Sequence, residues 1–276
     1  MKILDTHLHL VDLHRFSYPW LGNAPALNRN WSAESYFAEA SELGIEQALH
    51  MEVDVAESDM LAESTHMLGV HPRIAGAIAA GRPEKPGFAE HLERLATLGG
   101  VKGVRRILHT VPDEVSRTEL FAENIQRLPQ FGFSFDLCLR ADQLTIGAEL
   151  LDKAPDVQFI LDHCGVPDIA GGAFELWRDG ISAMAERPNL VVKLSGIVAY
   201  AAPDWTVETL RPYFDHVVAS FGFERMVWGS DHPVCTTTAD LTRWVEATHA
   251  LLSGANEVEK SAVLHRNAER IYRVGT

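Results

Sequence analysis

Short apolar runs alternate with amphipathic segments along the 276-residue chain. The runs are rich in strand-forming residues and nearly continuous in apolar character, which is typical of parallel strands buried on both faces. The eight runs are Ile3–Leu8, Glu46–Val53, Ile74–Ala80, Val101–Ile107, Phe133–Leu139, Val157–Asp162, Leu190–Leu194 and Arg225–Trp228.

Apolar residues at helical spacing fill the intervals between the runs. The segments with this spacing are Ser32–Leu43, Glu57–Leu68, Glu90–Leu98, Thr118–Leu128, Asp142–Lys153, Phe174–Glu186, Val207–Phe221, Leu241–Leu252 and, after the last run, Glu257–Tyr272. Gly44, Gly132 and Gly222 stand where a helix would end and the next strand begin, a usual place for a glycine cap.

Eight strand–helix units in this order predict one (β/α)8 TIM barrel, an α/β domain that covers residues 1–276. Such a barrel takes about 250 residues, which this chain supplies. An open, doubly wound parallel sheet is the alternative, because a strand count from one sequence is easily wrong by one or two. The stretch Arg15–Trp31, with two prolines, predicts a long ordered loop after the first strand.

Composition and charge narrow the class of partner. Hydrophobic residues make up 46% of the chain and charged residues 22%, as in globular proteins. The formal charge of −14 argues against partners such as nucleic acid or an anionic membrane. No run is long enough to span a membrane, the N-terminus is too polar for a secretory leader, and the three cysteines form no CxxC pair, so we expect a cytoplasmic protein with reduced thiols. The pattern does not indicate an oligomeric state.

Polar side chains gather where the predicted strands end. His7 and His9 stand two residues apart on the first run, so both point to the same face. His163 follows the sixth run and Asp231 follows the eighth. Because catalytic residues of TIM barrels project from the carboxyl ends of the strands, we expect these four side chains to converge at the barrel mouth.

Three cations lie inside apolar runs. Lys193 interrupts the seventh run, and since an unpaired buried ammonium is costly, we expect it to face a polar cavity or a carboxylate. Arg105 and Arg106 are adjacent in the fourth run, so only one of them can face inward. Glu52, at the end of the second run, is a weaker candidate for the site.

Taken together, these motifs resemble the amidohydrolase superfamily, in particular amidohydrolase family 2 and its sugar-lactonase branch. That branch includes L-fuconolactonase, L-rhamnonolactonase and 2-pyrone-4,6-dicarboxylate lactonase. The resemblance covers residues 3–272 and implies a barrel that hydrolyses a lactone ester at the carboxyl ends of its strands. The segments that carry it are His7–His9, Phe16–Leu21, Gly103–Arg106, Leu161–Gly165, Lys193–Gly196 and Gly229–Cys235.

The same resemblance bears on a metal ion. Metal-dependent amidohydrolases usually carry Lys on the fourth strand and His on the fifth, whereas this chain has arginines on the fourth and Asp136 on the fifth, so a binuclear centre is not expected. We expect either no cofactor or one divalent ion, Zn²⁺ or Mn²⁺. The ligands of such an ion would be His7, His9, His163 and Asp231.

For a lactone substrate, Asp231 is the expected general base that activates water. The three histidines would polarise the carbonyl, either as hydrogen-bond donors or through a bound ion. Sugar lactones carry hydroxyls and dicarboxylate lactones add carboxylates, which arginine can grip by two hydrogen bonds. The side chains expected to bind this small-molecule substrate are Arg105, Arg106, Lys193, Trp20, Tyr18 and His232.

Two other functions stay open at this point. A lactone isomerase or a metal-dependent decarboxylase could use the same scaffold, although the missing histidine on the fifth strand counts against the decarboxylase. A catalytically silent barrel that acts as a binding protein is the third hypothesis, and it does not require the polar strand ends to converge.

Overall fold

Eight parallel strands form a barrel in the computed structural model, which describes residues 1–275. The strands follow one another around the sheet in chain order, and each pairs in parallel with the next. They are β1 (Ile3–Leu8), β2 (Ile45–Met51), β3 (Ile74–Ala80), β4 (Val101–Ile107), β5 (Ser134–Cys138), β6 (Phe159–Leu161), β7 (Leu190–Leu194) and β8 (Met226–Trp228).

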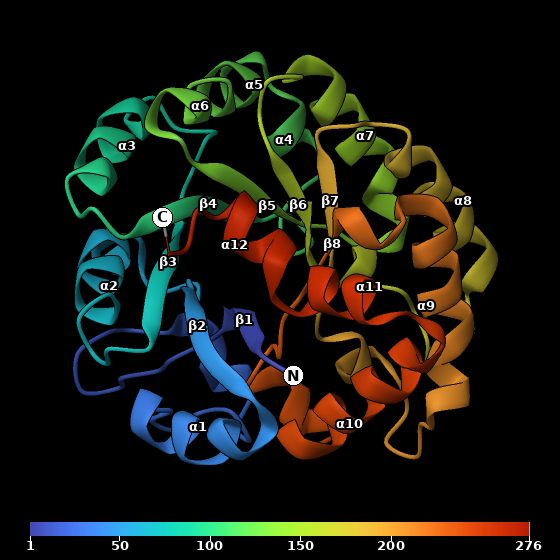
Figure 1. Cartoon of the computed structure of the whole chain (residues 1–276). Helices are drawn as coiled ribbons and strands as arrows, with labels where there is room; N and C mark the ends of the chain where they lie inside the picture. The colour runs from blue at the N-terminus through green and yellow to red at the C-terminus, as the bar shows by residue number, and fades with distance from the viewer. Residues whose placement is uncertain (276) are drawn as a thin grey trace.

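Helices surround the ring of strands and connect each strand to the next (Figure 1). They are α1 (Ala33–Ala40), α2 (Met60–Met67), α3 (Phe88–Ala96), α4 (Glu114–Arg117), α5 (Glu119–Ile125), α6 (Leu128–Phe131), α7 (Leu144–Lys153), α8 (Phe174–Ala185), α9 (Val207–Phe221), α10 (Leu241–Leu251), α11 (Glu257–Ser261) and α12 (Asn267–Ile271). Between β1 and α1 the chain forms a long loop, which is anchored by a bridge between Val11 and Trp31.

The barrel closes between β8 and β1 by backbone hydrogen bonds just beyond the end of β8. The Asp231 N–H donates to the His7 carbonyl at 2.8 Å, and the His9 N–H donates to the His232 carbonyl at 2.8 Å. The seam therefore brings together two of the segments in which the sequence places catalytic residues.

The opposite end of the barrel is closed by the last helix. Figure 1 shows α12 lying over the middle of the ring of strands. Asn267 donates to the carbonyl of Met226 at the start of β8 at 2.7 Å, and Lys2 pairs with Glu269 at 2.7 Å. Tyr272 packs inside the barrel in an apolar cluster with strand residues. Among the described residues, the open end of the barrel is therefore the one with the polar strand termini.

The predicted TIM barrel is confirmed, and four strands match their predicted bounds to the residue. The sixth run is shorter than expected, because Asp162 leaves the strand and begins a turn. The last helical segment is divided into α11, a wide turn at 262–266 and α12. Within residues 1–275, no helix is both long enough and apolar enough to cross a membrane.

Candidate active site

A cavity of about 230 Å³ opens at the carboxyl ends of the strands. Its polar lining includes His9, Arg105, His163 and Asp231. Apolar walls with a few convergent polar groups are typical of sites for small molecules. The apolar residues include Val11, Trp20, Leu27, Val53, Ile107 and Val234.

The expected convergence of imidazoles on Asp231 is present in the structure. Asp231 Oδ1 lies 3.4 Å from His9 Nε2 and 3.6 Å from His7 Nε2, and Oδ2 lies 3.8 Å from His163 Nδ1. All four side chains are buried. Segments separated by more than two hundred residues therefore meet at one point.

The hydrogen-bond partners of the His9 and His7 rings determine which nitrogen carries the proton. His9 Nδ1 lies 3.0 Å from the Met51 carbonyl, which can only accept, so Nδ1–H donates and Nε2 is a lone pair. Arg105 Nη1 lies 3.3 Å from His7 Nε2, so that nitrogen also accepts. The lone pairs of His7 and His9 thus face the Asp231 carboxylate, and the Arg105 guanidinium supplies a cation beside the His7 lone pair.

Burial sets the charge of these groups. It lowers the pKa of His9 to about 3 and holds the pKa of His7 and of His163 below the usual range. Burial also raises the pKa of Asp231 to about 6, although His163 and Arg105 oppose this shift. At neutral pH the site therefore holds neutral imidazoles and an ionised Asp231.

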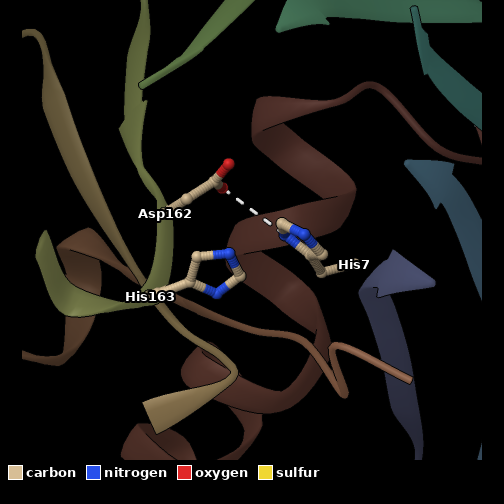
Figure 2. A group of neighbouring side chains, drawn as sticks. All are labelled: His7, Asp162 and His163. Carbon is tan, nitrogen blue, oxygen red and sulfur yellow. Dashed lines mark ion pairs between the residues drawn. The ribbon is translucent and has the colours of Figure 1, made fainter. Parts of the chain in front are cut away.

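His7 also faces a second carboxylate, that of Asp162. Figure 2 shows His7 opposite Asp162 and His163, which come from the end of β6. Asp162 Oδ1 lies 3.5 Å from His7 Nδ1, on the far side of the ring from Asp231. His163 Nδ1 lies 3.3 Å from the Ser195 carbonyl and 3.1 Å from its hydroxyl, so residues after β7 orient this ring.

The chain leaves its strands in strained conformations at these residues. His163 and Asp231 have φ values of 53° and 56°, a left-handed region that costs non-glycine residues about 1–3 kcal/mol. Gly196 faces both of them, with φ 60°, and a Cβ there would lie 2.3 Å from Asp231 Oδ2 and 2.6 Å from His163 Nδ1. The motif Lys193–Gly196 therefore needs glycine at its last position.

Lys193 pairs with carboxylates, as its place in an apolar strand predicts. Its Nζ lies 2.5 Å from Asp136 Oδ1 and 2.9 Å from Asp162 Oδ1, and 3.4 Å from His7 Nδ1. Burial alone would lower the pKa of Lys193, but the two carboxylates raise it above its usual value. The ammonium is fully buried and does not line the cavity, so the expected contact of Lys193 with substrate stays a prediction that this geometry does not support.

The two adjacent arginines take opposite faces of β4. Arg105 lines the cavity, with Nε 2.6 Å from Glu52 Oε1 and Nη2 2.7 Å from the Glu52 carbonyl. Arg106 turns outward and pairs with Glu84 at 2.7 Å. The expectation that Arg106 binds substrate is therefore corrected by the alternation of the strand, and Glu52 enters the site as the partner of Arg105.

Two of the three aromatic candidates lie behind the cavity. The Tyr18 hydroxyl accepts from the Asp12 N–H at 3.1 Å within the loop, and the His232 ring packs at 5.1 Å against Trp31. Neither of them lines the cavity, so the geometry gives no support to their expected contact with substrate. Trp20 does line it, fixed by an indole N–H that donates to the Val53 carbonyl at 2.7 Å.

Several lining residues escaped the sequence analysis. His109 and Thr110 follow β4, and Asp54 follows β2, so the rule that polar residues gather at strand ends would have found them. His109 Nδ1 lies 3.1 Å from Cys138 Sγ, and burial lowers the pKa of His109 to about 4. Tyr200 belongs to the long connection after β7 and carries no such signal.

Asp5 holds the seam together beneath the site. Its Oδ1 accepts from the His7 N–H at 2.9 Å and the Ser230 N–H at 2.7 Å. Its Oδ2 accepts from the Ser230 and Tyr36 hydroxyls, each at 2.5 Å. The buried Asp5 carboxylate therefore positions the backbone at His7 and at Ser230, the residue before Asp231.

The donor set fits one divalent cation. His7, His9 and Asp231 offer two imidazole lone pairs and a carboxylate within one small volume, and Asp231 Oδ2 has no hydrogen-bond partner among the described residues. Such N,O sets suit Zn²⁺ or Mn²⁺. A second set of His7, Asp162 and His163 shares His7, but Lys193 already supplies a cation 2.9 Å from Asp162. The geometry favours one ion over two.

Comparisons with known proteins agree with this architecture. A family model described as Amidohydrolase matches residues 4–274. The uncharacterized protein y4mH of Sinorhizobium fredii is 30% identical, with 99% of each chain covered. An L-fucono-1,5-lactonase of Burkholderia multivorans is 27% identical over 98% of this chain and 95% of its own. The crystal structure of an amidohydrolase from Burkholderia multivorans with bound zinc has a TM-score of 0.90 at 23% identity, over 99% of this chain and 100% of that one, which supports the fold.

Proposed function

The chain belongs to the amidohydrolase family, and from this premise we propose that it is a carboxylic-ester hydrolase that opens a sugar-acid lactone. The family resemblance drawn from the sequence motifs is thereby confirmed. The observation that carries the proposal is the buried meeting of Asp231 with His7, His9 and His163, of which Asp231, His9 and His163 line the cavity. The similarity to an L-fucono-1,5-lactonase supports the choice of a lactone as substrate.

Asp231 acts as the general base in this proposal. Its Oδ2 has no hydrogen-bond partner among residues 1–275, so it is available to take a proton from the attacking water. Water adds to the lactone carbonyl as Asp231 takes its proton, the acyl–oxygen bond breaks, and the ring oxygen takes that proton back from Asp231 and leaves as a hydroxyl. The product is an acid that ionises and releases one proton for each turnover.

Arg105 stabilises the charge that develops on the carbonyl oxygen. Its guanidinium lines the cavity beside His7, and Glu52 fixes its orientation. A divalent ion held by His7, His9 and Asp231 supplies Lewis-acid polarisation of the carbonyl when bound. The carbonyls and hydroxyl behind His9 and His163 keep both rings oriented.

The cavity walls suit a polyhydroxylated ring. The Trp20 indole offers an apolar surface for one face of the ring. Neutral polar groups of His109, Thr110 and Tyr200 lie around the same cavity and can exchange hydrogen bonds with ring hydroxyls.

A proton-release screen against a panel of aldonolactones tests this function. We expect at least one lactone to release one proton per molecule consumed and to give the open-chain acid. Chelation should lower the rate without abolishing it, and Zn²⁺ or Mn²⁺ should restore it. Activity that survives chelation would leave the electrophilic role to Arg105 alone.

Product analysis separates this proposal from the alternatives. An isomeric lactone without proton release would identify an isomerase, and release of carbon dioxide from a carboxylated substrate would identify a decarboxylase. A protein that binds lactones but changes none of them would be a binding protein and would contradict the proposed function.

A further inference from the structure

The proposed function leaves open whether the lactone carries a charge of its own. Among the residues that the structure describes, Arg105 is the one lysine or arginine that lines the cavity. Arg106 faces Glu84 outside the cavity, and Lys193 is enclosed by Asp136 and Asp162. A carboxylate on the substrate would therefore have to be paired by Arg105.

The nitrogen atoms of Arg105 already contact neighbouring groups, so Arg105 is not available to pair such a carboxylate. Its Nε and Nη2 donate to Glu52 at 2.6 and 2.7 Å, and its Nη1 lies 3.3 Å from His7 Nε2 and 3.8 Å from Asp162 Oδ2. Glu52 is as deeply buried as Arg105, so solvent does not weaken this ion pair. Nε and Nη2 are therefore engaged by Glu52, and Nη1, which the proposed function assigns to the lactone carbonyl oxygen, is not left for a substrate carboxylate.

Asp54 adds a carboxylate at the rim of the cavity. It lies three residues beyond β2, with φ 46° and its N–H donating to Glu52 Oε2 at 2.8 Å, so its position depends on the same residue that holds Arg105. Asp54 Oδ1 accepts from Arg82 Nη2 at 2.9 Å, and Arg82 lines a neighbouring groove and not this cavity. Asp54 Oδ2 accepts no hydrogen bond from residues 1–275.

We propose that Asp54 is a specificity-determining residue that selects lactones without a carboxylate or other anionic substituent. Its free oxygen can accept a hydrogen bond from a ring hydroxyl, which a neutral sugar lactone supplies, whereas a carboxylate at the same place has no hydrogen to donate and meets Oδ2 with lone pairs only. The same arrangement favours departure of the product, because hydrolysis converts the neutral lactone into an anion.

A matched pair of substrates tests this inference, which rests on the proposed function. An aldonolactone and the corresponding aldarolactone differ only in a terminal hydroxymethyl group that is replaced by a carboxylate. We expect the wild type to have the higher kcat/KM for the aldonolactone. Asn accepts the left-handed backbone and retains an oxygen for Arg82, so Asp54→Asn should reduce this preference by about tenfold.

Glu57→Gln is the control. Glu57 pairs with Lys85 near the same rim but does not line the cavity, so removing its charge should leave the preference unchanged. An aldarolactone preferred by the wild type, or a preference that Asp54→Asn leaves unchanged, would overturn the inference. If neither lactone is hydrolysed, the proposed function fails, and the ratio of dissociation constants for the two matching lactams, measured by calorimetry on the same proteins, decides the role of Asp54.

Discussion

The chemistry of single residues in this site depends on groups that never touch the substrate. The Met51 carbonyl fixes the proton of His9 on Nδ1, and Arg105 donates to His7 Nε2, so both rings present lone pairs to Asp231. Burial then keeps these rings neutral and raises the pKa of Asp231. The result is an anionic site that attracts a proton or a cation.

The raised pKa of Asp231 predicts an acid limb in the rate profile. The base form is the carboxylate, so protonation inactivates it. In protein freed of metal by chelation, any residual kcat/KM should rise with pH through about 6 and level off above pH 7. Initial rates between pH 4.5 and 8 measure this limb, and a profile that stays flat across pH 6 would contradict the assignment.

The close approach of Asp231 and His163 to Gly196 predicts that one added methyl group disturbs the site. Gly196→Ala would place its Cβ within 2.6 Å of both Asp231 and His163, in a backbone conformation that alanine disfavours. We expect kcat/KM to fall about 100-fold or more, because displaced catalytic groups lose their alignment. Gly222→Ala also has a positive φ but meets no atom within 4 Å of its Cβ, so it controls for backbone strain and should keep near wild-type kcat/KM.

At the scale of elements, the irregular ends of β6, β7 and β8 form the site. The strands themselves pair in register, but the chain turns sharply after each of them, and the turns carry His163, Gly196 and Asp231. The seam between β1 and β8 depends on Asp5, whose four hydrogen bonds hold both segments. The buried carboxylate of Asp5 therefore contributes both to the stability of the fold and to the positions of the catalytic residues.

Removal of the Tyr36 hydroxyl, which donates to Asp5, tests how far stability and activity depend on the seam between β1 and β8. Tyr36→Phe removes one donor to Asp5 and should lower the free energy of unfolding by about 1–2 kcal/mol. The expected loss of kcat/KM is several-fold, because Asp5 positions His7 and Ser230. Tyr213 is also buried but makes no side-chain hydrogen bond with the described residues, so Tyr213→Phe should change stability by less than about 0.5 kcal/mol. Chemical denaturation compares the two variants, and equal effects would refute the special role of Tyr36.

At the scale of the whole molecule, most of the fold was predictable because apolar runs and helical spacing are local signals. The meeting of His7, His9, His163 and Asp231 was predictable too, since a barrel places all strand ends on one face. The roles of neighbouring groups were less accessible. Whether Arg105 or Arg106 faces inward depends on the register of β4, and the enclosure of Lys193 depends on carboxylates from two other strands.

The length and geometry of the loops also limited how much of the site could be predicted from the sequence. Tyr18 and Trp20 are two residues apart in one loop, yet only Trp20 reaches the cavity. The position of Asp54 after a strand could have been read from the sequence, but its ion pair with Arg82 could not. These positions follow from contacts between distant segments, which no local pattern encodes.

The central claim is that one carboxylate performs the proton transfer. The most direct measurement is the kcat of Asp231→Asn on the best aldonolactone found for the wild type, at pH 7.5 and with circular dichroism to show that the variant is folded. We predict a decrease of about 100-fold to 10,000-fold, since the amide cannot accept the proton of water. A folded variant that hydrolyses the lactone at close to the wild-type rate would contradict the account.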